Sequence, residues 1–326
     1  MAIYYLNVKT IGRSAGGKST SAAAYRAGER IRDERTGQIF DHAHRTDVMH
    51  KQIVVPSKLA ALDMSWVHDR SALWNAAELA ERRGNARVAR EYVVALPHEL
   101  TPAQRLGLVQ RFSQELADQH GFAVDFAIHA PRPHNDPRSY HAHLLTTTRE
   151  LLPTGLGAKS ALDLRDSERR ARGLGTWLSE LLTVRARWAT ITNEALLNAN
   201  VHARIDHRSL DAQGLDREPV PHIPVGARHS EARGKRSEIA EKIRAAYRVR
   251  VQARLARTAD RAPATHSASN LEEIRREAQR SWLRLRQTKL EKVPAQPSGL
   301  AQDQACTDAL KESDARHTGR DDDLAM

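Results

Sequence analysis

The stretch 124–149 constrains this chain most, because it places four histidines beside two strand-like runs. The run 124–129 is apolar and rich in β-forming residues, and the run 140–148 ends in threonines, so both are predicted strands. The residues between them, 131–139, include three prolines and an Asn-Asp pair, which favour a loop. The pattern predicts a hairpin or two neighbouring strands.

Three of these histidines are candidate metal ligands. Side chains alternate between the two faces of a strand, so His141 and His143 share a face, about 7 Å apart. His129, at the end of the first strand, reaches the same point if the two strands pair. Three imidazoles suit a divalent catalytic ion with open positions. A structural zinc site usually has a fourth ligand, often cysteine, and the single cysteine is the distant Cys306.

The charge of the chain indicates a polyanionic partner. The 326 residues carry 51 Lys and Arg against 40 Asp and Glu, a net charge of +11. Nucleic acid is the simplest such partner. One cysteine excludes an intramolecular disulfide framework, and the sequence has neither a signal peptide nor an apolar run long enough to span a membrane. We therefore expect a cytoplasmic protein.

A glycine-rich loop near the N-terminus offers a second reading. A predicted strand at 1–8 is followed by this loop and by a predicted helix at 19–32. Residues Gly12 to Ser19 match a P-loop, which predicts a nucleotide-binding enzyme as an alternative function. Such an enzyme also needs a magnesium-binding Asp at the end of a second parallel strand, and the strand available ends at His129 instead. The loop amides, with Arg13 or Lys18, can equally hold a nucleic-acid phosphate.

Two further residues carry possible chemistry. Tyr25 lies on the predicted helix among small alanines and beside Arg26, which leaves the phenol accessible next to a cation. Glu91 interrupts an apolar predicted strand at 88–96. Its carboxylate either pairs with a surface arginine such as Arg90, or faces the histidines and orients a ligand or takes a proton.

The order of elements predicts an α+β fold, an antiparallel sheet with flanking helices, rather than a doubly wound α/β fold. Further helices are expected at 65–83, 101–120 and 174–200, a loop at 151–156 and a strand-like piece at 202–210. Prolines at 219, 221 and 224 close the folded unit. The predicted domains are 1–227, a basic helical extension at 228–293 and a disordered tail at 294–326.

Several of these motifs together resemble the relaxases of the MobA/MobL family, nickases of plasmid mobilisation with an HUH-type metal site. The resemblance covers about residues 2–227. It rests on Ile3-Tyr-Tyr-Leu6 with the Arg-Ser-x-Gly-Gly loop, Tyr25, the segments 89–91 and 95–97, Ile128-His129, Tyr140-His-Ala-His143 and Ala203-Arg-Ile-Asp-His207.

The resemblance implies a role for each candidate residue. Tyr25 attacks DNA, Glu91 assists, and His129, His141 and His143 bind a divalent metal ion, Mg²⁺ or Mn²⁺. The DNA-binding candidates are Arg13, Lys18 and Arg26. The chain departs from the family pattern in the prolines and His134 before the histidine pair, which leaves His134 and Asp136 as candidate outer contacts to the metal ligands or to DNA.

The implied activity is site- and strand-specific nicking and strand transfer at a plasmid origin of transfer, through a covalent 5′-phosphotyrosyl intermediate. The implied partners are single-stranded DNA at that origin, accessory mobilisation proteins and a coupling protein. Besides the P-loop enzyme, the alternatives are a rolling-circle replication initiator and a non-catalytic basic DNA-binding protein.

Overall fold

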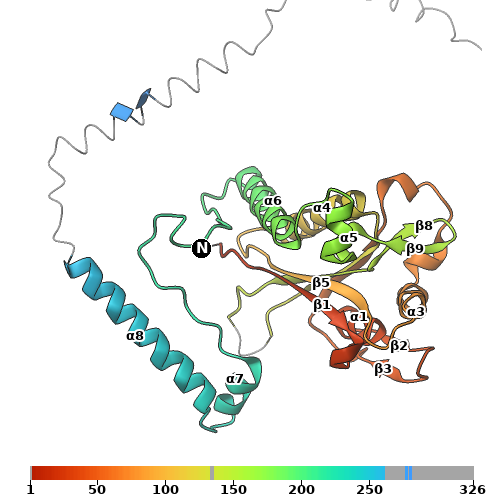
Figure 1. Ribbon diagram of the computed structural model, residues 1–326, viewed down its shortest axis with the longest axis horizontal. Coiled ribbons are helices and arrows are strands. Elements are labelled where there is room, and N and C mark those ends of the chain that lie inside the picture. The colour runs from red at the N-terminus through yellow and green to blue at the C-terminus, as the bar shows by residue number, and fades with distance from the viewer. Residues whose placement is uncertain (1, 133–135, 261–275, 278, 281–326) are drawn as a thin grey trace, which may run out of the picture. The chain divides into compact units, whose positions relative to one another are not determined.

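A computed structural model describes residues 2–132, 136–260, 276–277 and 279–280 (Figure 1). The chain divides into two units, Met1–Arg217 and Glu218–Met326. This division lies N-terminal to the predicted boundary at residue 227, and the predicted domain limits stay predictions. The expected tail at 294–326 falls outside the described residues.

The first unit is built on a five-stranded sheet in the order β1-β5-β7-β6-β4. Every neighbouring pair in it is antiparallel. The strands are β1 (Leu6–Gly12), β4 (Val48–Val54), β5 (Arg87–Ala95), β6 (Val124–His129) and β7 (His141–Thr146). An antiparallel sheet with helices packed on it confirms the predicted α+β class, and it differs from the parallel sheet that a P-loop enzyme requires.

Helices cover both faces of the sheet (Figure 1). Tyr92, Phe126 and Leu144 pack on one face beneath α4 (Pro102–His120) and α6 (Trp177–Asn198). On the other face, Ala89 and Leu145 pack against α1 (Ser19–Ala27) and α3 (Arg70–Ala80). Alternate side chains of one strand therefore enter two different cores, as expected for a sheet buried on both sides.

The remaining elements of the first unit are short. Two hairpins pair β2 (Arg30–Arg32) with β3 (Ile39–Asp41), and β8 (Arg149–Leu152) with β9 (Gly155–Lys159). The short helices are α2 (Ser65–His68), α5 (Asp166–Ala171), and the 3-10 turns η1 (Arg13–Ala15), η2 (Ser57–Leu59) and η3 (Ala161–Asp163). Among the helices of the described ranges, none combines the length and the apolar character that crossing a bilayer requires.

Several predicted elements were wrong in detail. The strand expected at 1–8 runs from Leu6 to Gly12, and the helix expected at 65–83 is broken at Asp69 into α2 and α3 and ends at Ala80. The helix expected at 19–32 ends at Ala27, because Gly28 adopts φ +61 and the chain then enters β2. The loop expected at 151–156 is the turn of the β8–β9 hairpin, where Gly155 has φ +136. No strand forms at 202–210, because the Asn193 side chain bonds both the amide and the carbonyl of Ile205 at 2.8 and 2.9 Å.

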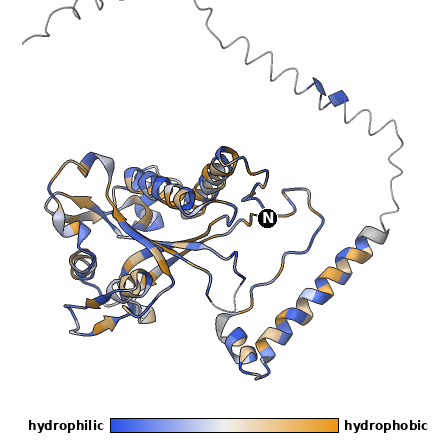
Figure 2. Cartoon of the chain, turned by 180° about the vertical axis from the view of Figure 1, so that it is seen from behind, coloured by the Kyte–Doolittle hydropathy of each residue, from blue (hydrophilic) through white to orange (hydrophobic). Residues whose placement is uncertain are grey.

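The second unit contains α7 (Val225–Ala232) and α8 (Glu238–Asp260). Arg244 of α8 donates to both carboxylate oxygens of Glu231 of α7, at 2.6 and 2.8 Å. Figure 2 shows hydrophilic and hydrophobic residues intermixed along the length of α8. A basic helical extension was predicted at 228–293, and α8 lies within it; beyond residue 260 the structure describes four positions of this range, all of them helical.

Candidate active site

The pairing of β6 with β7 brings three histidines together on the face of the sheet that packs against α1. His129 lies directly opposite His141, and His143 lies opposite Ala127, two positions further along. One nitrogen from each imidazole lies within 4.8 Å of the others. The ring centroids are 4.8 to 5.3 Å apart. This geometry fits a single metal ion with three nitrogen ligands.

Each imidazole uses its other ring nitrogen to contact a hydrogen-bond acceptor. These contacts join His129 Nε2 to the Arg26 carbonyl oxygen at 2.8 Å, His141 Nδ1 to the Ser139 carbonyl oxygen at 3.1 Å, and His143 Nδ1 to Glu91 Oε1 at 2.6 Å. A ring nitrogen that donates its proton in this way leaves the second nitrogen with a lone pair, and fixes the orientation of the ring. The nitrogens left for a metal ion are therefore Nδ1 of His129 and Nε2 of His141 and His143, and the Arg45 guanidinium, 3.5 Å from His129 Nδ1, has to move aside when an ion binds.

Burial also keeps two of these rings in the neutral form that a metal requires. Burial, together with the neighbouring His143 and Arg45, lowers the pKa of His129 to about 4, although the hydrogen bond to the Arg26 carbonyl oxygen acts to raise it. Burial likewise lowers the pKa of His141. Both imidazoles are therefore uncharged at neutral pH, and a metal ion does not have to displace a proton from them.

Glu91 lies behind the triad and is fully buried. Its carboxylate accepts from His143, from Arg26 Nη2 at 2.7 Å and from Lys9 Nζ at 2.9 Å. Burial acts to raise the pKa of Glu91, but the hydrogen bonds from His143 and Arg26 outweigh it and hold that pKa well below its usual value. A carboxylate with these three partners is suited to orienting an imidazole and poorly suited to taking a proton.

Tyr25 is the exposed aromatic residue of α1, with 37% of its surface accessible. Its hydroxyl accepts a hydrogen bond from Arg132 Nη2 at 2.5 Å. The Arg45 guanidinium lies 4.2 Å from the centre of its ring, and the His42 ring meets it edge-on at 5.2 Å. An open cavity of about 330 Å³ beside the ring is lined by these residues with His44, Thr46 and Asp47. The phenol is thus accessible and has a cation at its oxygen.

Arg45 connects the tyrosine to the histidines. It donates to the Tyr25 carbonyl oxygen, forms a hydrogen bond with Asp47 at 2.8 Å, and places Nη2 3.5 Å from His129 Nδ1. The hydrogen bond from Arg45 lowers the pKa of Asp47 to about 2, so Asp47 stays charged. Asp47 also lies 3.7 Å from Arg132 Nε. A continuous polar network therefore runs from the phenol to the triad.

Sequence reasoning missed Arg45, Asp47 and Arg132. They lie in or beside loops, where no periodicity marks the direction of a side chain. The available signal was composition alone, since charged residues flank the histidines both at 42–47 and after residue 129.

Of the three predicted DNA contacts, Arg26 lies beside the triad, whereas Arg13 and Lys18 are held by other residues. Arg13 is almost buried and bonds to Glu78 at 2.7 and 3.1 Å. Lys18 donates to Thr36 and Gln38 at 3.0 and 2.8 Å, close to the β2–β3 hairpin. Arg26 is paired with Glu91, so its positive charge balances the carboxylate that orients His143. Of the two candidate outer contacts, Asp136 pairs with Arg138, whereas His134 is outside the described residues.

The structure also explains the loop that matches a P-loop. The Glu78 carboxylate accepts from the Ser19 amide at 2.6 Å and from its hydroxyl at 2.9 Å, and so occupies the helix N-terminus where a phosphate would bind. The Gly17 amide donates to the Gly12 carbonyl oxygen at 3.0 Å, so the loop closes on itself. The donors of the motif are therefore used within the fold, which disfavours nucleotide binding.

The comparisons with known proteins agree with these features. A sequence profile of the MobA/MobL family matches residues 18–233. The chain belongs to the MobA/MobL family. Its relatives include the mobilization protein MobL of Acidithiobacillus ferridurans, 35% identical over 72% of this chain and 65% of that protein. The probable mobilization protein MobA of Bifidobacterium longum is 34% identical over 73% of this chain and 46% of that protein. This MobA/MobL chain thus spans less than two thirds of the length of either relative.

One solved structure, from work on vancomycin resistance transfer in Staphylococcus aureus, has a similar fold. It is 26% identical with a TM-score of 0.52, and the match covers 64% of this MobA/MobL chain and all of the other. The resemblance drawn from the motifs is confirmed by the family match, and the predicted relaxase-like α+β fold is confirmed with it.

Proposed function

We propose that this MobA/MobL protein is a metal-dependent DNA relaxase, a site- and strand-specific nickase and transesterase at a plasmid origin of transfer. The observation that carries the proposal is the polar network joining an exposed tyrosine to three convergent imidazoles. Relatives that are named as mobilization proteins support the plasmid context.

Tyr25 is the proposed nucleophile. Its hydroxyl oxygen attacks the phosphorus of one phosphodiester in single-stranded DNA and loses its proton to solvent. The bond from phosphorus to the 3′ oxygen breaks, the 3′ oxygen gains a proton, and the 5′ phosphate remains as an ester on Tyr25. A free 3′ hydroxyl can reverse the step without ATP, because one phosphate ester replaces another.

Two arginines assist at the reacting oxygen. Arg132 donates to the hydroxyl of Tyr25 and can stabilise the charge that develops on it during the attack. Arg45 lies against the ring and bonds to the backbone of the same residue, which fixes the direction of the phenol. Both cations also favour the approach of a phosphate group.

His129, His141 and His143 are the proposed metal ligands, and Glu91 positions His143. A divalent ion bound there would neutralise charge on the non-bridging oxygens of the scissile phosphate and fix its position. Imidazole nitrogens suit transition-metal ions, whereas Mg²⁺ prefers oxygen ligands. Of the two ions that the resemblance implies, we therefore propose Mn²⁺. The proposed macromolecular partners are single-stranded DNA at the origin of transfer, accessory mobilisation proteins and a coupling protein.

The test is formation of a covalent protein–DNA adduct. The full chain is incubated with Mn²⁺ and with single-stranded oligonucleotides that tile the origin of transfer, and the products are separated on a denaturing gel. Wild type forms the adduct and Tyr25→Phe does not, while Tyr5→Phe removes another exposed hydroxyl and serves as the matched control. His129→Ala, His141→Ala and His143→Ala each reduce the adduct strongly.

The other outcomes separate the alternatives. An adduct that persists in Tyr25→Phe contradicts the assignment of the nucleophile. Binding without cleavage under any metal ion indicates a non-catalytic DNA-binding protein, and cleavage confined to replication-origin oligonucleotides indicates a replication initiator. ATP binding that is lost in Lys18→Ala, with Tyr25→Phe active, supports the P-loop enzyme.

A further inference from the structure

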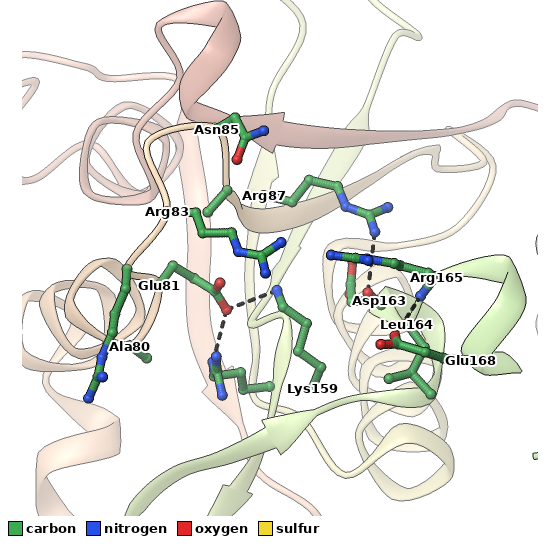
Figure 3. Close-up of a pocket in the computed structure, with 13 residues that line it drawn as sticks. Ala80, Glu81, Arg83, Asn85, Arg87, Lys159, Asp163, Leu164, Arg165 and Glu168 are labelled. Carbon is green, nitrogen blue, oxygen red and sulfur yellow. Dashed lines mark hydrogen bonds and ion pairs between the residues drawn. The ribbon is translucent and has the colours of Figure 1, made fainter.

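A second charged cavity lies away from the candidate active site, within the first unit. We call it the basic cleft. It encloses about 760 Å³ between the end of α3, the start of β5, the β8–β9 hairpin and the segment from η3 to α5 (Figure 3). Six of its lining side chains are cationic: Arg82, Arg83, Arg87, Arg149, Lys159 and Arg165.

The acidic residues of the basic cleft neutralise only part of this positive charge. Glu81 is engaged by Arg149 and Lys159, at 2.8 and 2.9 Å. The second acid, Asp163, is buried and pairs with Arg90. Glu168, the third acid, accepts from the backbone amide at residue 165.

Three other cations of the basic cleft have no acidic partner among the residues that the structure describes. Arg82, Arg83 and Arg165 are exposed and form no ion pair with any residue that the structure describes. Figure 3 shows Arg83 and Lys159 extending into the space between the α3–β5 loop and the β8–β9 hairpin, with Arg87 on its far side. The basic cleft therefore presents unpaired positive charge in a concave surface, which is suited to an anionic ligand.

The lining also indicates which anion would bind. None of the residues around the basic cleft is aromatic, and the apolar ones are two alanines and Leu164. A nucleotide cofactor or a splayed single-strand base needs a ring or apolar surface to stack on, and the basic cleft offers neither. Its guanidinium groups match phosphate oxygens instead, so it is suited to a phosphodiester backbone.

Strand β5 connects the basic cleft to the candidate active site. Val93 of this strand pairs with His143, and Arg87 lies six residues earlier, about 20 Å away at roughly 3.3 Å per residue. A neighbouring cavity of about 550 Å³ shares Arg87 with the basic cleft and extends along β1 to Lys9, which bonds Glu91. None of its lining residues lines the cavity beside Tyr25, and Val8, Arg90 and Trp177 lie on the face of the sheet opposite the metal ligands, so the link between the two sites is strand β5 itself.

We propose that the basic cleft binds the sugar-phosphate backbone of the DNA substrate at a second point, about 20 Å from the scissile phosphate. For a duplex flank this distance corresponds to about six nucleotide steps at 3.4 Å each, and for an extended single strand to fewer. The contact anchors the flank of the nick site without reading its sequence. The inference rests on the proposed function, because the DNA that occupies the candidate active site is the ligand that also reaches the basic cleft.

The test measures DNA binding separately from cleavage. Fluorescence anisotropy is recorded in a Tyr25→Phe background, with a short nick-site oligonucleotide and with the same oligonucleotide extended by eight or more nucleotides on either side. The extension is supplied as single strand in one arm and as duplex in the other. The cleft variant is Arg83→Ala with Arg165→Ala. The control variant is Arg111→Ala with Arg187→Ala, which removes the same charge from exposed positions on α4 and α6.

The control protein should gain about tenfold in affinity from the flank, and the cleft variant less than twofold. The slope of log affinity against log salt should fall by about 1.4 in the cleft variant if the flank binds as single strand, and by about 1.8 if it binds as duplex. Lysine at both positions should keep most of the slope, because the charge is retained.

Equal affinities and equal salt slopes of cleft and control variants in both arms would overturn the inference. So would binding of a polyglutamate peptide that depends on the cleft arginines while DNA affinity does not, since the ligand would then be an acidic protein. If wild type forms no adduct but the cleft variant loses the flank contribution, the nickase function fails and the basic cleft stands. If wild type forms the adduct but the cleft variant keeps the flank contribution, the inference about the basic cleft fails and the nickase function stands.

Discussion

Glu91→Gln is the change that separates orientation of a metal ligand from proton transfer. It removes one negative charge at nearly constant size from a fully buried position. The carboxylate is 2.6 to 2.9 Å from His143, Arg26 Nη2 and Lys9, and a glutamine can accept a bond but cannot balance two cations. Loss of one member of a buried ion pair typically costs about 3–5 kcal/mol. The Lys9 side chain is 53% exposed and can turn into solvent. We therefore expect the free energy of unfolding to fall by about 2–3 kcal/mol.

The same change should also weaken metal binding. Without the carboxylate, the His143 ring is less firmly oriented and less basic, so the affinity for Mn²⁺ should fall by about 10-fold to 100-fold. Adduct formation should fall in parallel at limiting Mn²⁺ and recover when the ion is saturating. Metal affinity is measured by calorimetry, and stability by urea unfolding of the metal-free protein.

Glu115→Gln is the matched control. This carboxylate also bonds two arginines, with Arg187 Nε at 2.6 Å and Arg111 Nε at 3.2 Å, but its side chain is 32% exposed and lies on α4. We expect a stability loss below about 1 kcal/mol and no change in metal affinity. The reasoning is refuted if Glu91→Gln binds Mn²⁺ within twofold of wild type yet forms no adduct at saturating ion, because Glu91 would then act as a base.

Three further predictions concern Arg132 at the phenol, the N-terminus of α1 and the buried His120 of α4. Arg132→Gln should slow adduct formation in single-turnover assays by about tenfold to a hundredfold, with Mn²⁺ affinity unchanged. Arg132→Lys should restore part of the rate. If Arg132→Gln and wild type react at equal rates, Arg132 has no part in the mechanism. Glu78→Gln should lower the free energy of unfolding by about 3 kcal/mol in urea titrations, because Arg13 and the α1 N-terminus lose their carboxylate; a loss below 1 kcal/mol would contradict the internal capping. Burial lowers the pKa of His120 to about 4, so the unfolded chain binds more protons than the native one between pH 6.5 and 4. Stability should therefore drop by roughly 3 kcal/mol as pH falls through that window, and this part of the drop should disappear in His120→Phe.

The histidine pair could be read from the sequence because strand geometry is local. Residues two apart on a strand share a face whatever the rest of the fold does, so His141 and His143 were predicted together. The approach of His129 needed the register of β6 against β7, which a loop of eleven residues does not fix in advance.

The charged residues show the opposite case. Arg26 is next to Tyr25 in sequence, yet it faces Glu91 because adjacent helix residues point about 100° apart and the sheet lies beneath that helix. Arg13 was expected at the surface of a glycine-rich loop and is instead held by Glu78, 65 residues away. Direction and partner of a long charged side chain depend on which elements pack beside it.

By itself, the sequence determined the strand and helix periods, the shared face of two imidazoles, the accessible phenol among alanines and the basic character that indicates a nucleic-acid partner. The tertiary structure alone decided the third imidazole, the orienting carboxylate, the arginine at the phenol oxygen and the basic cleft. The physical reason is range, because periodicity acts over only a few residues. His129 reaches His141 across a loop of eleven residues, the Glu91 and Arg132 contacts join residues 52 and 107 positions apart, and only the packing of the sheet brings these residues together.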